Sequence, residues 1–291
     1  HTVQVRDVPK KSFRTEPFEV GSQVLSAAMT PDGRRFAVRC FDQKVRVFSC
    51  VSDQPHSEVL LPAQSSASAS NLRPLFVGND RLVVSEDYQS VSCWNIDRKE
   101  TVWKYKPGRV LASAISPDGK WIALAEDATV VLLDAATGEP TDQPLKHSNL
   151  VDDLSFHPTS SRLLTACIDH TAHVFEIPSG KPIGPEIPHC EAVHRCAWSP
   201  DGATFATVQW TGDLIRVWKP SDHRQEETLA AASADHNPFV RINDQGDRWM
   251  PSGFDNWRDR TAVEILDLKS GKRLGPKLSG PGLISDADFI P

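Results

Sequence analysis

Leu111-Ala-Ser-Ala-Ile-Ser-Pro117-Asp118-Gly119-Lys-Trp-Ile-Ala-Leu decides the fold, because the chain repeats this stretch. Each copy has two alternating apolar runs around a Pro-Asp-Gly turn or its equivalent, a pattern typical of a β-hairpin. Such internal repetition predicts an array of equivalent β-units. The other copies are Leu25-Ser-Ala-Ala-Met-Thr-Pro31-Asp32-Gly33-Arg-Arg-Phe-Ala-Val, the looser Val151-Asp-Asp-Leu-Ser-Phe-His-Pro158-Thr-Ser-Ser-Arg-Leu-Leu, and Ala192-Val-His-Arg-Cys-Ala-Trp-Ser-Pro200-Asp201-Gly202-Ala-Thr-Phe-Ala-Thr.

The spacing of the turns gives the size of the unit. Turn centres fall near residues 31, 77, 117, 158, 200 and 245, so the repeat is about 40–47 residues, the length of one four-stranded propeller blade. Each hairpin is followed by a third apolar strand and a polar outer strand marked by Gly or Pro, which discourages pairing with other chains. The sequence therefore predicts an all-β fold, a β-propeller of four-stranded antiparallel blades with six full repeats and a split or incomplete seventh.

The whole chain, residues 1–291, is predicted to form this single propeller. The seventh blade lacks residues for its second strand, so we expect the chain to be a window cut from a longer polypeptide, or a ring with a stretch missing. Residues 60–70 form a low-complexity stretch rich in Ser and Ala, which predicts a linker between the first two blades. The predicted blades are residues 21–60, 71–105, 106–146, 147–188, 189–230 and 236–280, with residues 1–20 and 281–291 as the two parts of the seventh.

Composition narrows the classes of partner. The net charge is −6 and the basic residues are scattered, which disfavours a nucleic-acid partner. No apolar run reaches the length of a membrane span, and the chain does not begin with a signal-peptide pattern. The six cysteines form no CxxC pair, and four lie in predicted strands, which favours a reduced, intracellular and cytoplasmic protein.

The Ser-Pro-Asp-Gly turns and a recurrent Asp-x-Thr phrase resemble those of WD40-repeat β-propellers, over essentially the whole chain. In that family a Trp, a turn Asp, a Ser or Thr and an entry-loop His form a hydrogen-bonded brace within a blade. The resemblance assigns His147, Thr165, Asp169 and Phe175 to these positions in the fourth repeat. Because Phe replaces Trp, the brace is expected to be partial. By the same phrase, Asp42 and Asp127 are structural turn residues, and Asp127 and Asp169 should accept hydrogen bonds from backbone N–H groups.

The outer phrases, Gly180-Lys-Pro-Ile-Gly184-Pro185 and Gly271-Lys-Arg-Leu-Gly275-Pro276, are similar to those of bacterial WD40 arrays. That resemblance implies a link to serine/threonine kinases or other signalling domains in long chains. Other domains of the same longer chain are therefore among the expected partners.

Catalytic motifs are absent from the sequence: there is no Gly-x-Ser-x-Gly elbow, phosphate-binding Gly-rich loop or HExxH motif. Asp152-Asp153 is expected to be a solvated strand edge rather than an acid/base pair. His189-Cys190-Glu191 suggests a structural turn rather than a metal site. His170 and His173 are expected to point to opposite faces of a strand, which disfavours a shared metal. We therefore predict no catalytic residue, no metal and no cofactor. The alternative is a propeller enzyme of hydrolase or lactonase type with its site in the central channel.

Bulky side chains in the turns between second and third strands point to binding. Trp, Tyr and Arg are enriched at binding hot spots, and loops on a rigid sheet commonly carry recognition residues. For each single aromatic, packing over the adjacent blade stays an open alternative. The main hypothesis is a non-catalytic protein-interaction or sensing scaffold in a larger regulatory protein, with a protein or peptide partner. The predicted partner-binding residues are Phe41, Tyr88, Trp210, Trp257 and Arg258.

Overall fold

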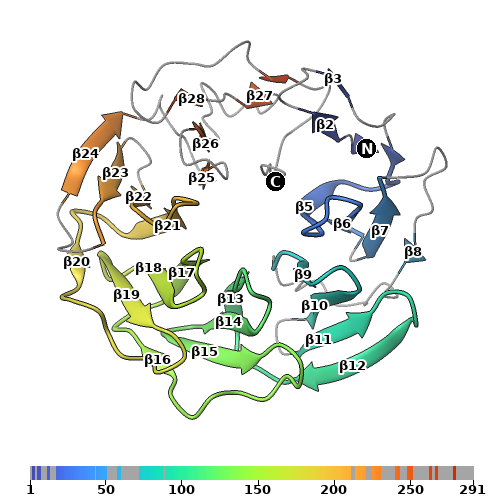
Figure 1. Ribbon diagram of the computed structural model, residues 1–291, viewed down its shortest axis with the longest axis horizontal. Coiled ribbons are helices and arrows are strands. Elements are labelled where there is room, and N and C mark those ends of the chain that lie inside the picture. Colours follow the sequence, from blue (N-terminus) through green and yellow to red (C-terminus); the bar gives the residue numbers. More distant parts are fainter. Residues whose placement is uncertain are drawn as a thin grey trace. The chain divides into compact units, whose positions relative to one another are not determined.

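A computed structural model gives the structure of the protein (Figure 1). It divides into two compact units, with the boundary between Pro107 and Gly108. In the described part of the chain, all regular secondary structure consists of β-strands. The structure describes residues 2–3, 5–7, 12–13, 18–42, 44–50, 58–59, 72–87, 90–210, 214–220, 225–230, 240–242, 248–251, 262–263, 266–267 and 278–279.

The first unit contains two four-stranded antiparallel sheets and two short strand pairs. In each large sheet the strands pair with their neighbours in chain order. The first sheet is β5 (Val24–Met29), β6 (Arg35–Cys40), β7 (Val45–Ser49) and β8 (Glu58–Val59), and the second is β9 (Leu75–Val77), β10 (Arg81–Asp87), β11 (Ser90–Asn95) and β12 (Glu100–Tyr105). The short pairs join β1 (Thr2–Val3) to β4 (Phe18–Glu19) and β2 (Arg6–Asp7) to β3 (Ser12–Phe13).

The second unit repeats the same meander in three four-stranded sheets, which run from green to orange in Figure 1. They are β13 (Val110–Ile115), β14 (Trp121–Glu126), β15 (Thr129–Asp134) and β16 (Leu145–Lys146); β17 (Val151–Phe156), β18 (Arg162–Cys167), β19 (Thr171–Glu176) and β20 (Ile187–Pro188); and β21 (Val193–Trp198), β22 (Phe205–Gln209), β23 (Leu214–Trp218) and β24 (Gln225–Ala230). A three-stranded sheet follows, with β25 (Val240–Ile242), β26 (Arg248–Pro251) and β28 (Leu266–Asp267), and β27 (Ala262–Val263) pairs with β29 (Leu278–Ser279).

These sheets confirm the predicted fold class, an all-β chain of four-stranded antiparallel propeller blades. The five four-stranded sheets lie within the predicted blade ranges from 21–60 to 189–230. The number of blades and the division of the seventh stay predictions. The predicted linker, residues 60–70, and the predicted C-terminal strand, residues 281–291, lie outside the described residues.

The repeated phrase folds as a hydrogen-bonded turn. In the second unit, Gly119 N donates to Ser116 O at 2.8 Å, and the Ser116 hydroxyl donates to Asp118 Oδ1 at 2.6 Å. The same carboxylate accepts from Lys120 N, and the Ser116 hydroxyl accepts from Trp121 N at 2.9 Å. Gly119 has φ +71°, a left-handed conformation that glycine adopts without steric cost. Equivalent bonds occur in the turns at residues 30–35 and 199–204.

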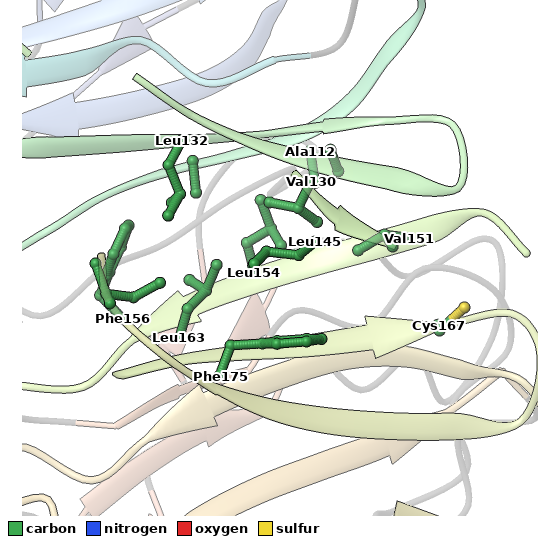
Figure 2. Close-up of a cluster of buried hydrophobic side chains, with 13 residues drawn as sticks. Ala112, Val130, Leu132, Leu145, Val151, Leu154, Phe156, Leu163, Cys167 and Phe175 are labelled. Atoms are coloured by element: carbon green, nitrogen blue, oxygen red, sulfur yellow. The ribbon is translucent and has the colours of Figure 1, made fainter. Parts of the chain in front are cut away.

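Apolar side chains fill the space between neighbouring blades. In the second unit, one cluster combines residues of β14–β16 with residues of β17–β19 (Figure 2). Leu132 and Leu163 have no exposed surface. Burying a leucine side chain stabilises a fold by about 1.5–3 kcal/mol. The alternating apolar residues of each strand thus join adjacent blades as well as strands within a blade.

Polar side chains join the innermost strands of two adjacent blades. Asp153 Oδ2 accepts from Cys196 N at 3.1 Å, and Ser155 Oγ accepts from Trp198 N at 3.2 Å. Innermost strands expose a row of backbone groups along one edge. Side chains of β17 therefore satisfy backbone donors of β21 and fix the position of one blade against the next.

Candidate protein-interaction surface

The turns between the second and third strands occupy equivalent places in four blades. In each, the first turn residue donates its backbone N–H to the carbonyl of the residue one position before the innermost strand. Because this bond repeats, these four residues lie at the same end of their own sheets. The bonds are Phe41 N to Gln23 O (2.7 Å), Asp127 N to Arg109 O (3.1 Å), Ile168 N to Leu150 O (2.9 Å) and Trp210 N to Ala192 O (2.8 Å).

Trp210 combines exposure with a fixed position. Its side chain is 54 % exposed, whereas Trp103, Trp198 and Trp218 are 6–8 % exposed. The indole meets the His194 ring edge to face, with ring centroids 4.7 Å apart. A backbone hydrogen bond and a ring contact thus hold an aromatic surface open to solvent.

A contact between a carboxylate and an imidazole supports this tryptophan. His194, which is buried, contacts the Asp152 carboxylate through Nδ1. Asp152 lies on β17 and His194 on β21, so the pair joins the innermost strands of adjacent blades. Asp152 therefore positions the imidazole against which Trp210 rests. The sequence predicted Trp210 but gave no sign of this support, because the partners are 42 residues apart.

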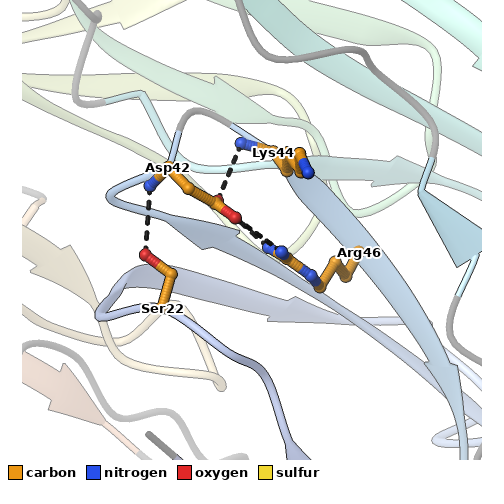
Figure 3. A network of polar contacts seen from close by, with 4 residues as sticks. All are labelled: Ser22, Asp42, Lys44 and Arg46. Atoms are coloured by element: carbon orange, nitrogen blue, oxygen red, sulfur yellow. Dashed lines mark hydrogen bonds and ion pairs between the residues drawn. The ribbon is translucent and has the colours of Figure 1, made fainter.

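In the first unit, Phe41 occupies the equivalent turn and is 66 % exposed. Beside it, Asp42 Oδ2 lies 2.5 Å from Arg46 Nη2, and Asp42 Oδ1 accepts from Lys44 N at 3.2 Å (Figure 3). Asp42 N also donates to Ser22 Oγ. The hydrogen bond from Arg46 holds the pKa of Asp42 below its usual value, so the carboxylate stays ionised and fixes the turn.

The residues that the resemblance assigned to the fourth-blade brace make three contacts. His147 Nε2 lies 2.8 Å from Thr165 Oγ1, and Asp169 Oδ1 accepts from Thr171 N at 3.0 Å. The His147 ring meets Phe175 at a centroid distance of 5.4 Å. Burial lowers the pKa of His147 to about 4, so its imidazole is neutral at pH 7.

Sequence reasoning missed a more complete brace in the fifth blade. His189 Nε2 lies 2.8 Å from Thr207 Oγ1, which also accepts from Trp218 Nε1 at 2.8 Å. The available signal was spacing: His189 precedes Thr207 by 18 residues, as His147 precedes Thr165. Burial lowers the pKa of His189 to about 4. The turn interpretation of residues 189–191 thus gains a specific role for His189 within its blade.

Asp127 differs from the sequence expectation. Its side chain is exposed and makes no hydrogen bond or ion pair with any residue the structure describes. The reason is turn length: only residues 127–128 separate β14 from β15, whereas residues 168–170 separate β18 from β19. The shorter turn contributes Asp127 through its backbone, which donates to Arg109 O and accepts from Val151 N at 2.9 Å.

Three predicted binding residues, Tyr88, Trp257 and Arg258, lie outside the described residues. Within the described ranges, no group of three or more His, Cys, Asp or Glu side chains is arranged to hold a metal ion. The same ranges contain no helix with the length and apolarity needed to span a membrane.

Comparison with known proteins agrees with this architecture. Residues 139–176 match the family described as WD domain, G-beta repeat, and this segment includes all four residues assigned to the fourth-blade brace. Together with the four-stranded blades, the repeated turns and the braces, this match supports a WD40 propeller-like protein.

Three similar proteins extend the comparison. The chain is 28% identical over 149 residues to U3 small nucleolar RNA-associated protein 21 of Saccharomyces cerevisiae, covering 51% of this chain and 15% of that protein. It is 30% identical over 124 residues to a WD repeat-containing protein of Synechocystis, covering 42% and 35%. It is 29% identical over 132 residues to serine-threonine kinase receptor-associated protein of Dictyostelium discoideum, covering 44% and 43%. The matched part spans less than half the length of each relative.

Proposed function

We propose that this chain is a non-catalytic scaffold that binds a protein partner through the turns between its second and third strands, with Trp210 as an anchor. WD40 relatives imply a protein-interaction role in general. The observation that carries the specific proposal is the 54 % exposure of Trp210 on a turn held by Ala192 and His194. Exposed tryptophan on a rigid turn offers a large apolar area with little side-chain entropy to lose on binding.

Packing in the core of the blade does not account for Trp210. The blade's core is closed by Phe205 and Trp218, whose side chains are buried. Trp210 stands apart from this core, at a place where the fourth blade has the smaller Ile168. An indole at this position therefore adds exposed apolar surface that a bound partner would bury.

The same proposal includes Phe41 in the first unit as a second anchor, since it occupies the equivalent turn. Tyr88, Trp257 and Arg258 stay predicted anchors on sequence grounds alone.

We also propose a regulatory role within a larger intracellular protein, whose other domains are candidate partners. The three relatives are longer than their matched parts, which supports only the larger size in this proposal. The six free cysteines support a reducing, cytoplasmic location.

Quantitative affinity capture tests the proposal. Wild-type chain, Trp210→Ala, Phe41→Ala and Val102→Ala are used as baits, and captured proteins are quantified by mass spectrometry. Val102 is an exposed apolar residue on β12 rather than in a turn, so it is the matched control. We expect specific partners to be depleted from the Trp210→Ala sample and retained by Val102→Ala. Equal recovery with all four baits would reject the proposed surface.

A further inference from the structure

The end of the second unit that presents Trp210 is acidic. We define the Trp210 rim as Trp210, the entry segments 108–110, 149–153 and 191–195, and the turns 126–128 and 168–170. Carboxylates outnumber guanidinium groups in it by six to two, so the rim is anionic at neutral pH. The carboxylates are Glu126, Asp127, Asp152, Asp153, Asp169 and Glu191, and the guanidinium groups are Arg109 and Arg195.

Described contacts connect the rim around the tryptophan. Asp127 O accepts from Val151 N, which brings the turn of the third blade beside Asp152. Asp152 contacts His194, whose ring lies against Trp210. On its other side, Trp210 N donates to Ala192 O, so Glu191 is one residue from that contact. Backbone bonds and the His194 contacts thus link the segments that carry Asp127, Asp152 and Glu191 to Trp210.

Two of these carboxylates are available to a ligand. Asp127 and Glu191 are exposed, and neither side chain pairs with any other residue described. The remaining four already accept bonds within the fold. Their partners are Gly108 N for Glu126, His194 for Asp152, Cys196 N for Asp153 and Thr171 N for Asp169.

An exposed indole among unpaired carboxylates favours one class of ligand. The face of a Trp ring attracts a guanidinium or ammonium group within roughly 6 Å of its centre. The carboxylates add attraction for further cations and repel phosphate and acidic side chains. We propose that the Trp210 rim binds a basic peptide segment of the partner, with an Arg or Lys side chain against Trp210 and neighbouring cations beside Glu191 and Asp127. This inference rests on the proposed function and specifies the chemistry of its partner.

The test measures binding of three fluorescein-labelled dodecapeptides to the full chain. One peptide alternates glycine with arginine, the second alternates glycine with glutamate, and the third alternates glycine with glutamine. Fluorescence polarisation should show saturable binding of the arginine peptide alone, weakening as salt rises. Trp210→Ala should weaken this binding by about tenfold or more. Glu191→Gln should weaken it by about two- to fivefold and reduce its salt dependence. Val102→Ala and Asp142→Asn, an exposed carboxylate outside the rim, should bind as wild type.

Three outcomes would overturn the inference: no saturable binding of the arginine peptide up to millimolar concentration, equal binding of all three peptides, or arginine-peptide binding unaffected by Trp210→Ala and Glu191→Gln. Circular dichroism checks the fold of each variant, and Trp210→Phe replaces Trp210→Ala if the latter is unfolded. A partner that depends on Trp210 in affinity capture but prefers neutral or acidic peptides would leave the proposed scaffold function intact and reject only its basic ligand.

Discussion

Trp218 donates its indole N–H to Thr207 Oγ1 across 2.8 Å, and Thr207 has no exposed surface. The bond completes a chain whose proton positions follow from its partners. His189 Nδ1 lies 2.9 Å from Ile187 O, which can only accept, so Nδ1 carries the proton. In the neutral imidazole Nε2 is then an acceptor, and it receives the Thr207 hydroxyl proton. Each polar side-chain atom in this series of hydrogen bonds, from Ile187 through His189 and Thr207 to Trp218, has a partner.

Trp218→Phe should therefore destabilise the protein beyond the loss of ring volume. The expected extra loss is about 0.5–1.5 kcal/mol for the missing hydrogen bond. Trp198→Phe is the matched control, because Trp198 is equally buried and its Nε1 has no hydrogen-bond partner among the residues that the structure describes. Urea denaturation measures both variants. Equal shifts in midpoint would show that the Trp218 bond adds nothing to packing.

Acid should destabilise the fold through His147 and His189. Both have folded pKa values of about 4, against about 6.5 for an unperturbed histidine. As pH falls below about 6.5 the unfolded chain binds protons first, so stability is complete above that pH and declines toward pH 4. We expect each histidine to account for about 1–2 kcal/mol of the loss at pH 5.

Urea midpoints measured between pH 7 and pH 4.5 check this effect, with His189→Gln as the comparison. The variant starts from lower stability because glutamine does not reproduce the imidazole contacts. Its midpoint should nevertheless depend less steeply on pH than that of the wild type. Parallel pH profiles would contradict a neutral, buried His189.

The turn aspartates should differ in their effect on stability. Asp169→Ala removes the acceptor of Thr171 N and should cost about 1–3 kcal/mol. Asp127→Ala removes an exposed side chain without a described partner, at a residue whose φ of +50° aspartate tolerates somewhat better than alanine, so its cost should stay below about 1 kcal/mol. Thermal denaturation of the two variants is the measurement. A large loss with Asp127→Ala would mean that the sequence phrase, rather than the turn length, identifies the structural aspartate.

Two glycines with the same backbone conformation should tolerate alanine differently. Gly119 and Gly202 have φ +71° and +69°, so alanine is strained at both, by about 1 kcal/mol or more. A Cβ at position 119 meets nothing within 4 Å, whereas one at position 202 would come 2.2 Å from His157 Nε2. The His157 ring would have to leave its contact with Trp198. Gly202→Ala should thus lower the denaturation midpoint more than Gly119→Ala, and the reverse order would contradict the turn geometry.

The part of the fold that could be predicted depends on residues close together in sequence. Ser-Pro-Asp-Gly encodes its own turn through bonds among residues 116–121, so alternating strands on either side could be placed in four-stranded antiparallel sheets. Local sequence could not predict the Asp152–His194 pair, because it joins strands of different blades. The same is true of the hydrogen bonds that Asp153 and Ser155 accept from backbone N–H groups of β21. The expectation that the Asp127 side chain accepts backbone hydrogen bonds was wrong, because its turn is one residue shorter than the turn that contains Asp169.

Isothermal titration calorimetry tests the central claim most directly. The first protein recovered with the wild-type chain is titrated with wild type, Trp210→Ala and Val102→Ala, after equal thermal stability of the three is established. A scaffold that uses Trp210 as an anchor predicts dissociation constants raised about tenfold or more by Trp210→Ala and unchanged by Val102→Ala. Equal dissociation constants for wild type and Trp210→Ala would contradict the account.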